Sequence, residues 1–175
     1  MKHFLRLCLL LLCLSSCKQK TFFSKVTVWP GDKNVESLDR NNGFKDLKLN
    51  RHISALIKYL DKSNPSNAAG YTIYQVKADS LAKFNIDEIK IKSIKTHFLN
   101  NLLFRFEVEL EGENNAFPFY LLLIDAYGGA YPENTSLETY KWIGNNVSLK
   151  YTVEPNRNAT AEFTSIILAK AMGAG

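Results

Sequence analysis

The chain has 175 residues, with 22 basic and 17 acidic side chains and a formal net charge of +5. An excess of this size is too small to indicate a nucleic-acid-binding protein. The length and the apolar share of 46% indicate a globular chain with one packed core, and exclude a disordered or fibrous one.

The N-terminal segment has the order of a secretory signal peptide. Lys2 and Arg6 form a positive leader, residues 7–14 are an uninterrupted run of Leu and Cys, and small residues follow. The run is far shorter than the roughly 20 residues of a membrane-spanning helix. Cleavage after residue 16 would remove both basic residues and no acidic one, which would lower the net charge from +5 to +3.

The segment Leu14-Ser15-Ser16-Cys17 closes this leader and resembles the lipobox of bacterial lipoproteins. The resemblance implies cleavage between Ser16 and Cys17, a diacylglyceryl thioether on Cys17 and usually an amide-linked acyl chain. Two or more chains hold a protein stably at a membrane. Lys18 after the cysteine implies the outer membrane, with the domain facing the periplasm. The alternative is a plain secretory signal followed by a chance cysteine.

Cysteine usage limits the chemistry of the mature chain. Cys8 and Cys13 leave with the signal, so that Cys17 would be the one remaining cysteine. A disulfide framework and a thiolate metal cluster are thereby excluded, and we expect neither a metal nor a cofactor.

The remaining chain is expected to be a tether followed by one domain. Residues 17–43 are predicted to be a lipidated N-terminus and tether, and residues 44–175 a globular domain. Within the tether, residues 22–29 alternate well enough for a short strand that docks on the domain edge, and a free tether is the alternative. A helix is predicted at 51–61, because Asn50 is a good N-cap and apolar residues follow at helical spacing.

Six strands are expected from the alternation of apolar and polar residues. Their ranges are 71–77, 88–98, 102–110, 138–143, 147–154 and 160–168. The second and third form a hairpin around Asn100-Asn101, a basic strand beside an acidic one, whose charges should pair on the solvent face. Residues 117–127 suit a buried helix or a strand, and Pro118 near the start and Gly128-Gly129 at the end favour the helix.

These elements predict an α+β fold with the order α-β-β-β-α-β-β-β. The two halves, at about 47–111 and 115–170, have the same order without a residue-level repeat. We expect a mostly antiparallel sheet of about six strands, with two helices packed on one face around a single core.

No motif with a known chemistry occurs in the domain. His52 and His97 lack the neighbours of a metal or catalytic site, and a structural role is expected for both. Asp125 and Glu133 could serve as the paired carboxylates of a glycoside hydrolase. The alternative for Asp125 is a solvated position near the end of its helix.

A group of aromatic residues gives the one candidate binding surface. Tyr127, Tyr131, Tyr140 and Trp142 lie in and around the loop at 128–137. Such residues can stack on sugar rings or fill a pocket of a partner. Tyr140 and Trp142 share one side of a predicted strand, so core packing is the alternative for these two.

The sequence therefore predicts a lipid-anchored cell-envelope protein whose domain binds an envelope protein or a glycan. A periplasmic inhibitor or immunity protein is a variant of the same class, and a hydrolase of envelope polymers and a spacer lipoprotein are the rivals. No catalytic motif supports the hydrolase, so we do not expect an enzyme. The sequence does not indicate an oligomeric state.

Overall fold

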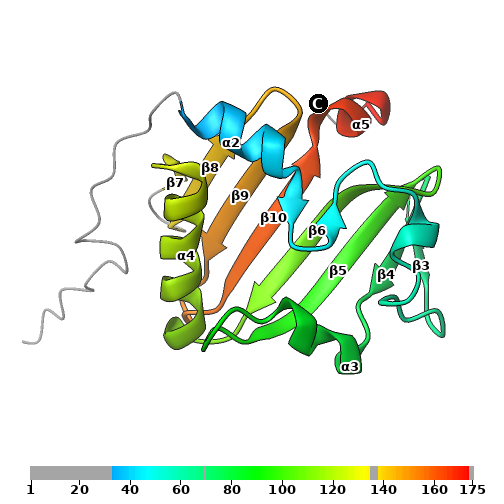
Figure 1. Ribbon diagram of the computed structural model, residues 1–175, viewed down its shortest axis with the longest axis horizontal. Helices are drawn as coiled ribbons and strands as arrows, with labels where there is room; N and C mark the ends of the chain where they lie inside the picture. The colour runs from blue at the N-terminus through cyan, green and yellow to red at the C-terminus, as the bar shows by residue number, and fades with distance from the viewer. Residues whose placement is uncertain (1–32, 69, 135–137, 174–175) are drawn as a thin grey trace, which may run out of the picture.

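The computed structural model describes residues 33–68, 70–134 and 138–173. Its main feature is an antiparallel sheet of eight strands, in the order β3-β4-β5-β6-β10-β9-β8-β7 (Figure 1). The strands are β3 (Ser66–Ala68), β4 (Tyr71–Gln75), β5 (Ile91–Leu99), β6 (Leu102–Leu110), β7 (Tyr131–Asn134), β8 (Thr139–Ile143), β9 (Val147–Val153) and β10 (Ala159–Ser165). A second, two-stranded sheet joins β1 (Gly43–Phe44) to β2 (Leu47–Lys48).

The large sheet consists of two meanders that meet in its centre. The first runs from the edge strand β3 inwards to β6, and the second runs from the opposite edge strand β7 inwards to β10. β6 and β10 pair antiparallel, so the last strand of each meander lies beside the other. The predicted α+β fold with an antiparallel sheet is confirmed, and the two halves of similar order correspond to the two meanders.

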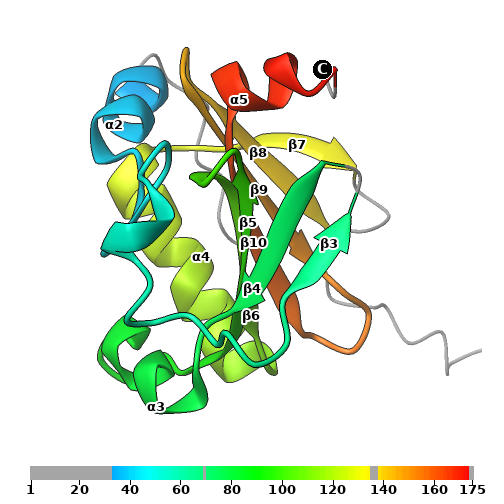
Figure 2. The same ribbon diagram turned by 90° about the vertical axis from the view of Figure 1, so that its right-hand side faces the viewer.

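The helices lie mainly on one face of this sheet. The helical elements are α2 (Lys33–Asn41), η2 (Ile53–Ala55), α3 (Ala78–Leu81), η3 (Ala82–Phe84), α4 (Glu113–Tyr127) and α5 (Ile166–Ala171). Figure 2 shows α2, α3 and α4 on one side of the sheet and α5 across its upper end. We call the side of α2, α3 and α4 the helix face and the opposite side the open face. The core lies between the helices and the sheet, where Phe106 and Phe163 stack with ring centroids 4.7 Å apart.

Helix α4 forms the link between the meanders. Its buried residues recur at helical spacing, with Ala116, Phe119, Tyr120, Leu123 and Tyr127 against the core. The helix begins after Gly112 (φ +73°) and ends at Gly128 (φ +78°), backbone conformations that glycine adopts without steric cost. The segment 117–127, for which the sequence allowed a helix or a strand and favoured the helix, is therefore helical.

Asp39 on α2 ties this helix to the turn between β8 and β9. Its Oδ1 accepts the backbone N–H groups of Asn146 at 2.9 Å and Val147 at 3.1 Å, and its Oδ2 accepts that of Asn145 at 2.8 Å. Gly144 permits this approach, because a Cβ atom there would overlap the Asp39 carboxylate. One side chain thus joins two segments that are far apart in the sequence.

The predicted hairpin of β5 and β6 is confirmed, together with its two-residue turn and the pairing of opposite charges across it. Asn100 and Asn101 have φ angles of +48° and +65°, as a two-residue type I′ turn requires. On the open face, Lys95 pairs with Glu109 at 2.7 Å, and further along the hairpin Lys92 lies 3.7 Å from Glu111. The predicted basic strand therefore lies beside the predicted acidic one.

The helix predicted at 51–61 is wrong. Only Ile53–Ala55 form a short 3-10 helix, and turns follow. The backbone groups of this segment bond to other elements: Ile53 N–H donates to Asn101 O, and Asp61 N–H donates to Gln75 O, both at 2.8 Å. A helix of this length is marginal by itself, so these tertiary hydrogen bonds decide its conformation.

Several further elements differ from the sequence expectation, and the short elements β1, β2, α3 and η3 were not predicted at all. Residues 33–41, placed in the tether, form α2 and bury Leu38 in the core. The edge strands β3 and β7 are polar and were expected to be loops. The last strand ends at Ser165 rather than at residue 168, because the Ser165 side chain accepts the N–H of Leu168 and begins α5.

The remaining N-terminal predictions fall outside the described residues. These are the signal peptide, cleavage between Ser16 and Cys17, lipidation of Cys17 and the docked strand at 22–29. Among the helices of the described ranges, none combines the length and the apolar character that crossing a membrane requires.

Candidate functional site

The open face of the sheet is built from the polar positions of its strands. Side chains alternate between the two faces of a strand, and the helices cover the apolar side. On β9 the buried residues Val147, Leu149 and Tyr151 point to the helices, which leaves Ser148 and Lys150 on the other side. β8 and β10 follow this alternation over part of their length, with Trp142 and Ile143 on β8 and Ala161 and Glu162 on β10 as buried and less buried neighbours. Among the helices that the structure describes, α5 is the one that reaches towards this side (Figure 2).

The strand registers align charged residues in one row across the open face. From β7 to β4 the row reads Tyr131, Lys141, Lys150, Glu162, Glu107, Lys95 and Gln75. Lys141 lies directly opposite Lys150, and Glu107 lies directly opposite Glu162. Like charges in directly opposed positions destabilise a sheet. The row therefore keeps two unfavourable pairs, one of which lies where the sheet approaches α5.

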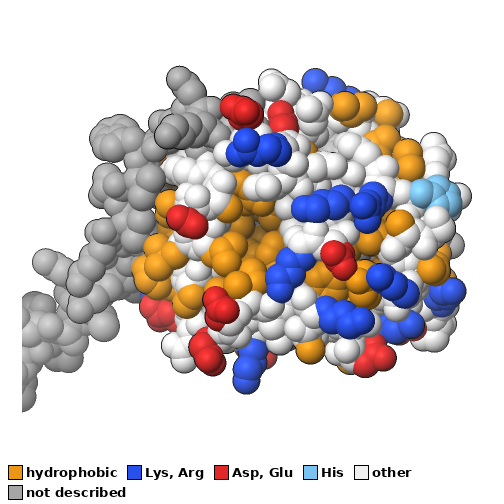
Figure 3. All heavy atoms as spheres, in the orientation of Figure 1, with side chains coloured by type: hydrophobic (Ala, Val, Ile, Leu, Met, Phe, Trp, Pro, Cys, Tyr) orange, Lys and Arg blue, Asp and Glu red, His pale blue; other side chains and the backbone are white. Residues whose placement is uncertain are grey.

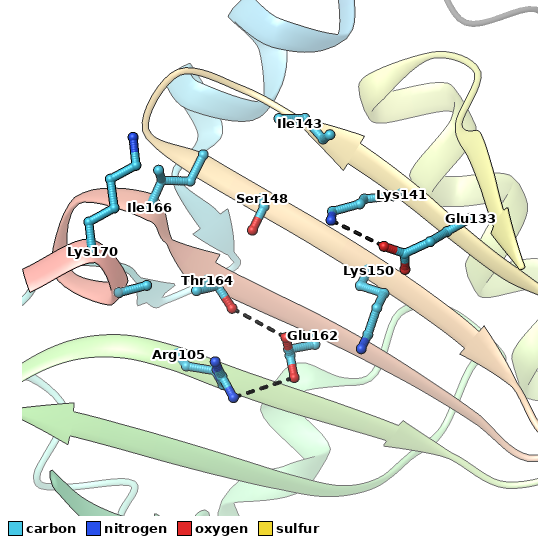
Figure 4. A pocket seen from close by; sticks show the side chains of 11 residues that line it. Arg105, Glu133, Lys141, Ile143, Ser148, Lys150, Glu162, Thr164, Ile166 and Lys170 are labelled. Carbon is cyan, nitrogen blue, oxygen red and sulfur yellow. Dashed lines mark hydrogen bonds and ion pairs between the residues drawn. The ribbon is translucent and has the colours of Figure 1, made fainter. Parts of the chain in front are cut away.

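A pocket of about 360 Å³ opens at this end of the row. It lies on β8, β9 and β10, and α5 closes one side (Figure 4). The lining residues are Arg105, Glu133, Lys141, Ile143, Ser148, Lys150, Glu162, Thr164, Ile166, Ala169 and Lys170. Four of them are basic and two are acidic, so the lining carries a net charge of +2. We call this the α5 pocket.

Only two of the four cations in the α5 pocket have an ionic partner. Lys141 Nζ lies 3.2 Å from Glu133 Oε1, and Arg105 Nη1 lies 3.8 Å from Glu162 Oε2 (Figure 4). Within the part of the chain that the structure describes, Lys150 and Lys170 have neither an ion pair nor a side-chain hydrogen bond. The pocket therefore holds positive charge that its own carboxylates do not neutralise.

Exposed apolar side chains occur on three of the elements that line the α5 pocket, β7, β8 and α5. Four large hydrophobic residues of the described chain are clearly exposed, and three of them belong to this region: Tyr131 (52%), Ile143 (47%) and Ile167 on α5 (58%). The fourth, Leu121 (41%), lies on α4. Exposed apolar groups around a concave polar site are typical of binding surfaces.

The helix face has a different character. Figure 3 shows hydrophobic side chains gathered in its left half, and Lys and Arg side chains mainly to the right of them. Phe117 and Ile124 on α4 are partly buried there and pack against the core. These side chains serve to cover the hydrophobic core, so this face is a weaker candidate for a binding site.

Two acidic residues on the open face are held in their charged form by β5. Glu109 accepts a hydrogen bond from Lys95 at 2.7 Å and one from Ser93 at 2.6 Å, which lowers the pKa of its carboxyl. Glu107 Oε1 lies 3.2 Å from His97 Nε2, and this close approach of the imidazole lowers the pKa of Glu107. These groups stabilise the central hairpin and lie outside the α5 pocket.

The stability of the protein is expected to fall in acid partly because of Glu109. Its folded pKa lies below the ordinary value of about 4.5, so its contribution is complete above that pH and is lost as the pH falls through the folded value. We expect a Glu109→Gln variant to lose less stability than the wild type between about pH 5 and pH 3. Urea unfolding across this range measures the difference.

Glu111 provides the matched control for this variant. It lies near the end of the same hairpin, is exposed, and approaches Lys92 only to 3.7 Å, beyond hydrogen-bonding distance. A Glu111→Gln variant removes a carboxylate of the same hairpin without removing a hydrogen bond, so its slope is the reference for that of Glu109→Gln. Equal slopes for the wild type and Glu109→Gln would contradict the role assigned to Glu109.

The structure separates the four aromatic residues of the predicted binding surface. Trp142 is fully buried and donates from Nε1 to Gly128 O at 2.9 Å, and Tyr127 is buried in the same core. Tyr140 is half-buried with its ring 4.9 Å from that of Tyr120. Core packing, the alternative raised for Tyr140 and Trp142, thus describes both. Only Tyr131 presents its ring to solvent, beside the α5 pocket.

Burial also alters the acidity of these tyrosines. It raises the pKa of Tyr127 to about 12, and it raises the pKa of Tyr140 as well. A raised pKa keeps the phenol neutral at physiological pH. The neutral Tyr127 hydroxyl donates to Gly43 O at 3.3 Å.

The structure does not place the candidate carboxylates and histidines in one site. Asp125 is exposed on α4 at the helix face, whereas Glu133 points into the α5 pocket on the open face. His97 is buried on β5 beside Glu107, and His52 is exposed and bonded to Ser54. In the described ranges no three His, Cys, Asp or Glu side chains are grouped so as to hold a metal ion.

Comparisons with known proteins add no relative. No protein-family model, no curated protein and no solved structure matches this chain. The α5 pocket was missed in the sequence, because its residues come from six separate elements. The signal that could have indicated it was the run of outward-facing polar residues on the last three strands.

Proposed function

We propose that the protein is a lipid-anchored binding module of the bacterial cell envelope, which holds a partner on the open face of its sheet. The single observation that carries the binding role is the α5 pocket, where unpaired lysines lie among exposed apolar side chains. Lys150 and Lys170 are exposed, and they differ from scattered surface charges because both line one concave site of about 360 Å³.

The anchoring part of the proposal rests on the leader and its cysteine. The positive residues, the apolar run and Leu14-Ser15-Ser16-Cys17 follow the order of a lipoprotein signal. Residues 18–32 would separate the lipid from α2 and can span at most about 50 Å. An open face on such a domain could therefore meet partners near the membrane as well as farther from it.

The binding role is tested by capture of envelope components on the immobilised mature chain. A double variant, Tyr131→Ala with Ile143→Ala, removes two exposed apolar groups beside the pocket. We expect it to reduce the captured partner about tenfold or more, because exposed aromatic and apolar anchors dominate binding energy. Thermal unfolding of each variant verifies that the fold is retained.

Leu121→Ala is the matched control, since Leu121 is similarly exposed but lies on the helix face. It should capture as much partner as the wild type. If the Leu121 variant loses the partner and the double variant keeps it, the open face is not the binding surface.

The anchor is tested separately in the full-length protein. A Cys17→Ser variant is expected to lose incorporation of labelled fatty acid and to leave the membrane fraction, because it lacks the thiol that receives the lipid. Unchanged fractionation and labelling would contradict lipidation at Cys17.

A further inference from the structure

We propose that the α5 pocket binds the anionic head of a small amphiphilic ligand, and that Lys150 and Arg105 hold this head. The inference rests on the proposed function, because it names the chemistry of a ligand for the same open face. Three observations support it. Lys150 lacks a counter-ion among the described residues, Arg105 has donors that its partner does not use, and one side of the pocket is apolar.

Lys150 is a cation that lacks a counter-ion within the described chain. It lies directly opposite Lys141 on β8 and directly opposite Glu162 on β10. Its ammonium nevertheless makes no ion pair with Glu162, which interacts with Arg105 and Thr164 instead (Figure 4). An anion beside Lys150 would relieve the repulsion between the two lysines as well as gain its own attraction.

Arg105 has donors that its carboxylate partner does not use. The distance of 3.8 Å from its Nη1 to Glu162 Oε2 permits an ionic attraction but exceeds a hydrogen bond. Its Nε–H is buried, and no acceptor for it exists among the described residues. Because Nε is buried, the donors available to a ligand are the Nη1 and Nη2 groups of this side chain, which is 30% exposed. Such a pair of N–H groups is suited to a carboxylate or a phosphate, which accept two parallel hydrogen bonds.

The other residues of the pocket fit the two ends of such a ligand. The Ser148 hydroxyl lies beside the cations and can donate to an oxyanion, whereas the Thr164 hydroxyl already donates to Glu162 Oε1 at 3.4 Å (Figure 4). Ile143, Ile166 and Ala169 line the side towards α5 and offer an apolar surface. A volume of about 360 Å³ is at the small end of ligand pockets, so it fits a charged head with a short chain.

Glu162 and Glu133 limit which ligands the pocket accepts. Each is matched to one cation, Arg105 or Lys141, so the excess charge is +2 rather than +4. A phosphate monoester, with a charge of about −1.5 to −2, would neutralise most of this excess, and a carboxylate would neutralise half of it. A strongly polyanionic ligand would bring its further charges close to the two carboxylates.

The test is calorimetric titration of the full mature chain carrying Cys17→Ser, which avoids lipid and detergent. Hexyl phosphate and hexanoate represent the two anionic heads, and hexanol is the neutral analogue. We expect at least one anionic probe to bind at least tenfold more tightly than hexanol. Binding of hexyl phosphate alone assigns a phosphate head, and binding of hexanoate alone assigns a carboxylate head.

Lys150→Gln should weaken binding of the anionic probe at least tenfold, because it removes the positive charge that attracts the head of the ligand. Lys62→Gln, an exposed lysine outside the pocket, is the matched control and should bind as the wild type does. Equal binding of hexanol, no binding of either anion, or no effect of Lys150→Gln would overturn the inference.

The result is separable from that of the proposed function. One outcome is that the open-face variants abolish partner capture while no anionic probe binds. The open face is then supported as the binding surface, and the ligand chemistry assigned to the α5 pocket is wrong. The other outcome is that the probe binds in a Lys150-dependent manner while the open-face variants capture the partner as the wild type does. The ligand site in the α5 pocket is then supported, and the surface assigned to the partner is wrong.

Discussion

Replacement of Trp142 by alanine is expected to lower the free energy of unfolding by about 3–5 kcal/mol. The indole is fully buried on β8, its Nε1 donates to Gly128 O at 2.9 Å, and its ring lies 6.2 Å from that of Tyr120. The substitution leaves a large cavity under α4 and removes the donor for the carbonyl at the end of that helix. Urea unfolding of the wild type and the variant measures the loss.

Trp142→Phe separates the two contributions. The phenyl ring fills most of the cavity but cannot donate to Gly128 O, so we expect a smaller loss of about 1–2 kcal/mol. The pair of variants also tests the location of the aromatic residues. If Trp142→Ala kept wild-type stability and instead abolished partner capture, Trp142 would be a surface residue, contrary to the structure.

Asp39→Ala is expected to have the second-largest effect, a loss of about 2 kcal/mol. The carboxylate accepts three backbone N–H groups of the β8–β9 turn, and hydrogen bonds to charged groups are the stronger ones. Two of these N–H groups are accessible to water, which limits the cost of losing them. The variant should also speed hydrogen exchange of the amides of residues 145–147.

Asp39→Asn is the conservative control. Its Oδ1 can still accept from Asn146 and Val147, whereas the charge and the acceptor for Asn145 are lost. We expect about half the destabilisation of the alanine variant, roughly 1 kcal/mol. An alanine variant as stable as the wild type, with unchanged exchange at the turn, would show that packing alone holds α2.

The sequence could predict the elements whose patterns are local. The alternating residues of β5 and β6, with Asn100-Asn101 between them, contain both the strand signal and the turn signal. The end signals around α4 likewise lie within one segment. Each of these elements carries a strong local signal, which tertiary contacts support rather than override.

The secondary-structure predictions were wrong where tertiary contacts decide the conformation. Residues 51–61 have a helical apolar spacing, but their backbone groups are bonded to β4 and to the β5–β6 turn. α2 is polar over most of its length, and its attachment through Asp39 depends on a turn more than 100 positions later. The edge strands β3 and β7 are short and polar, so they lack the alternation that marks an inner strand.

The α5 pocket illustrates a further limit. The alternation of β9 and β10 indicates that Lys150 and Thr164 face away from the core. It does not indicate that β10 lies beside β6, which brings Arg105 to the same pocket. It also does not show that the chain turns into α5 after Ser165. The residues were therefore predictable one by one as solvent-facing, but not as a site.

The most direct test of the central claim is photo-crosslinking of the full-length protein in intact cells. A photoreactive phenylalanine derivative is placed at Ile143, on the open face, and in a second variant at Leu121, on the helix face; the two positions are similarly exposed. The account predicts a discrete crosslinked product from position 143 and none from position 121. A product from position 121 alone would contradict the assignment of the open face as the binding surface.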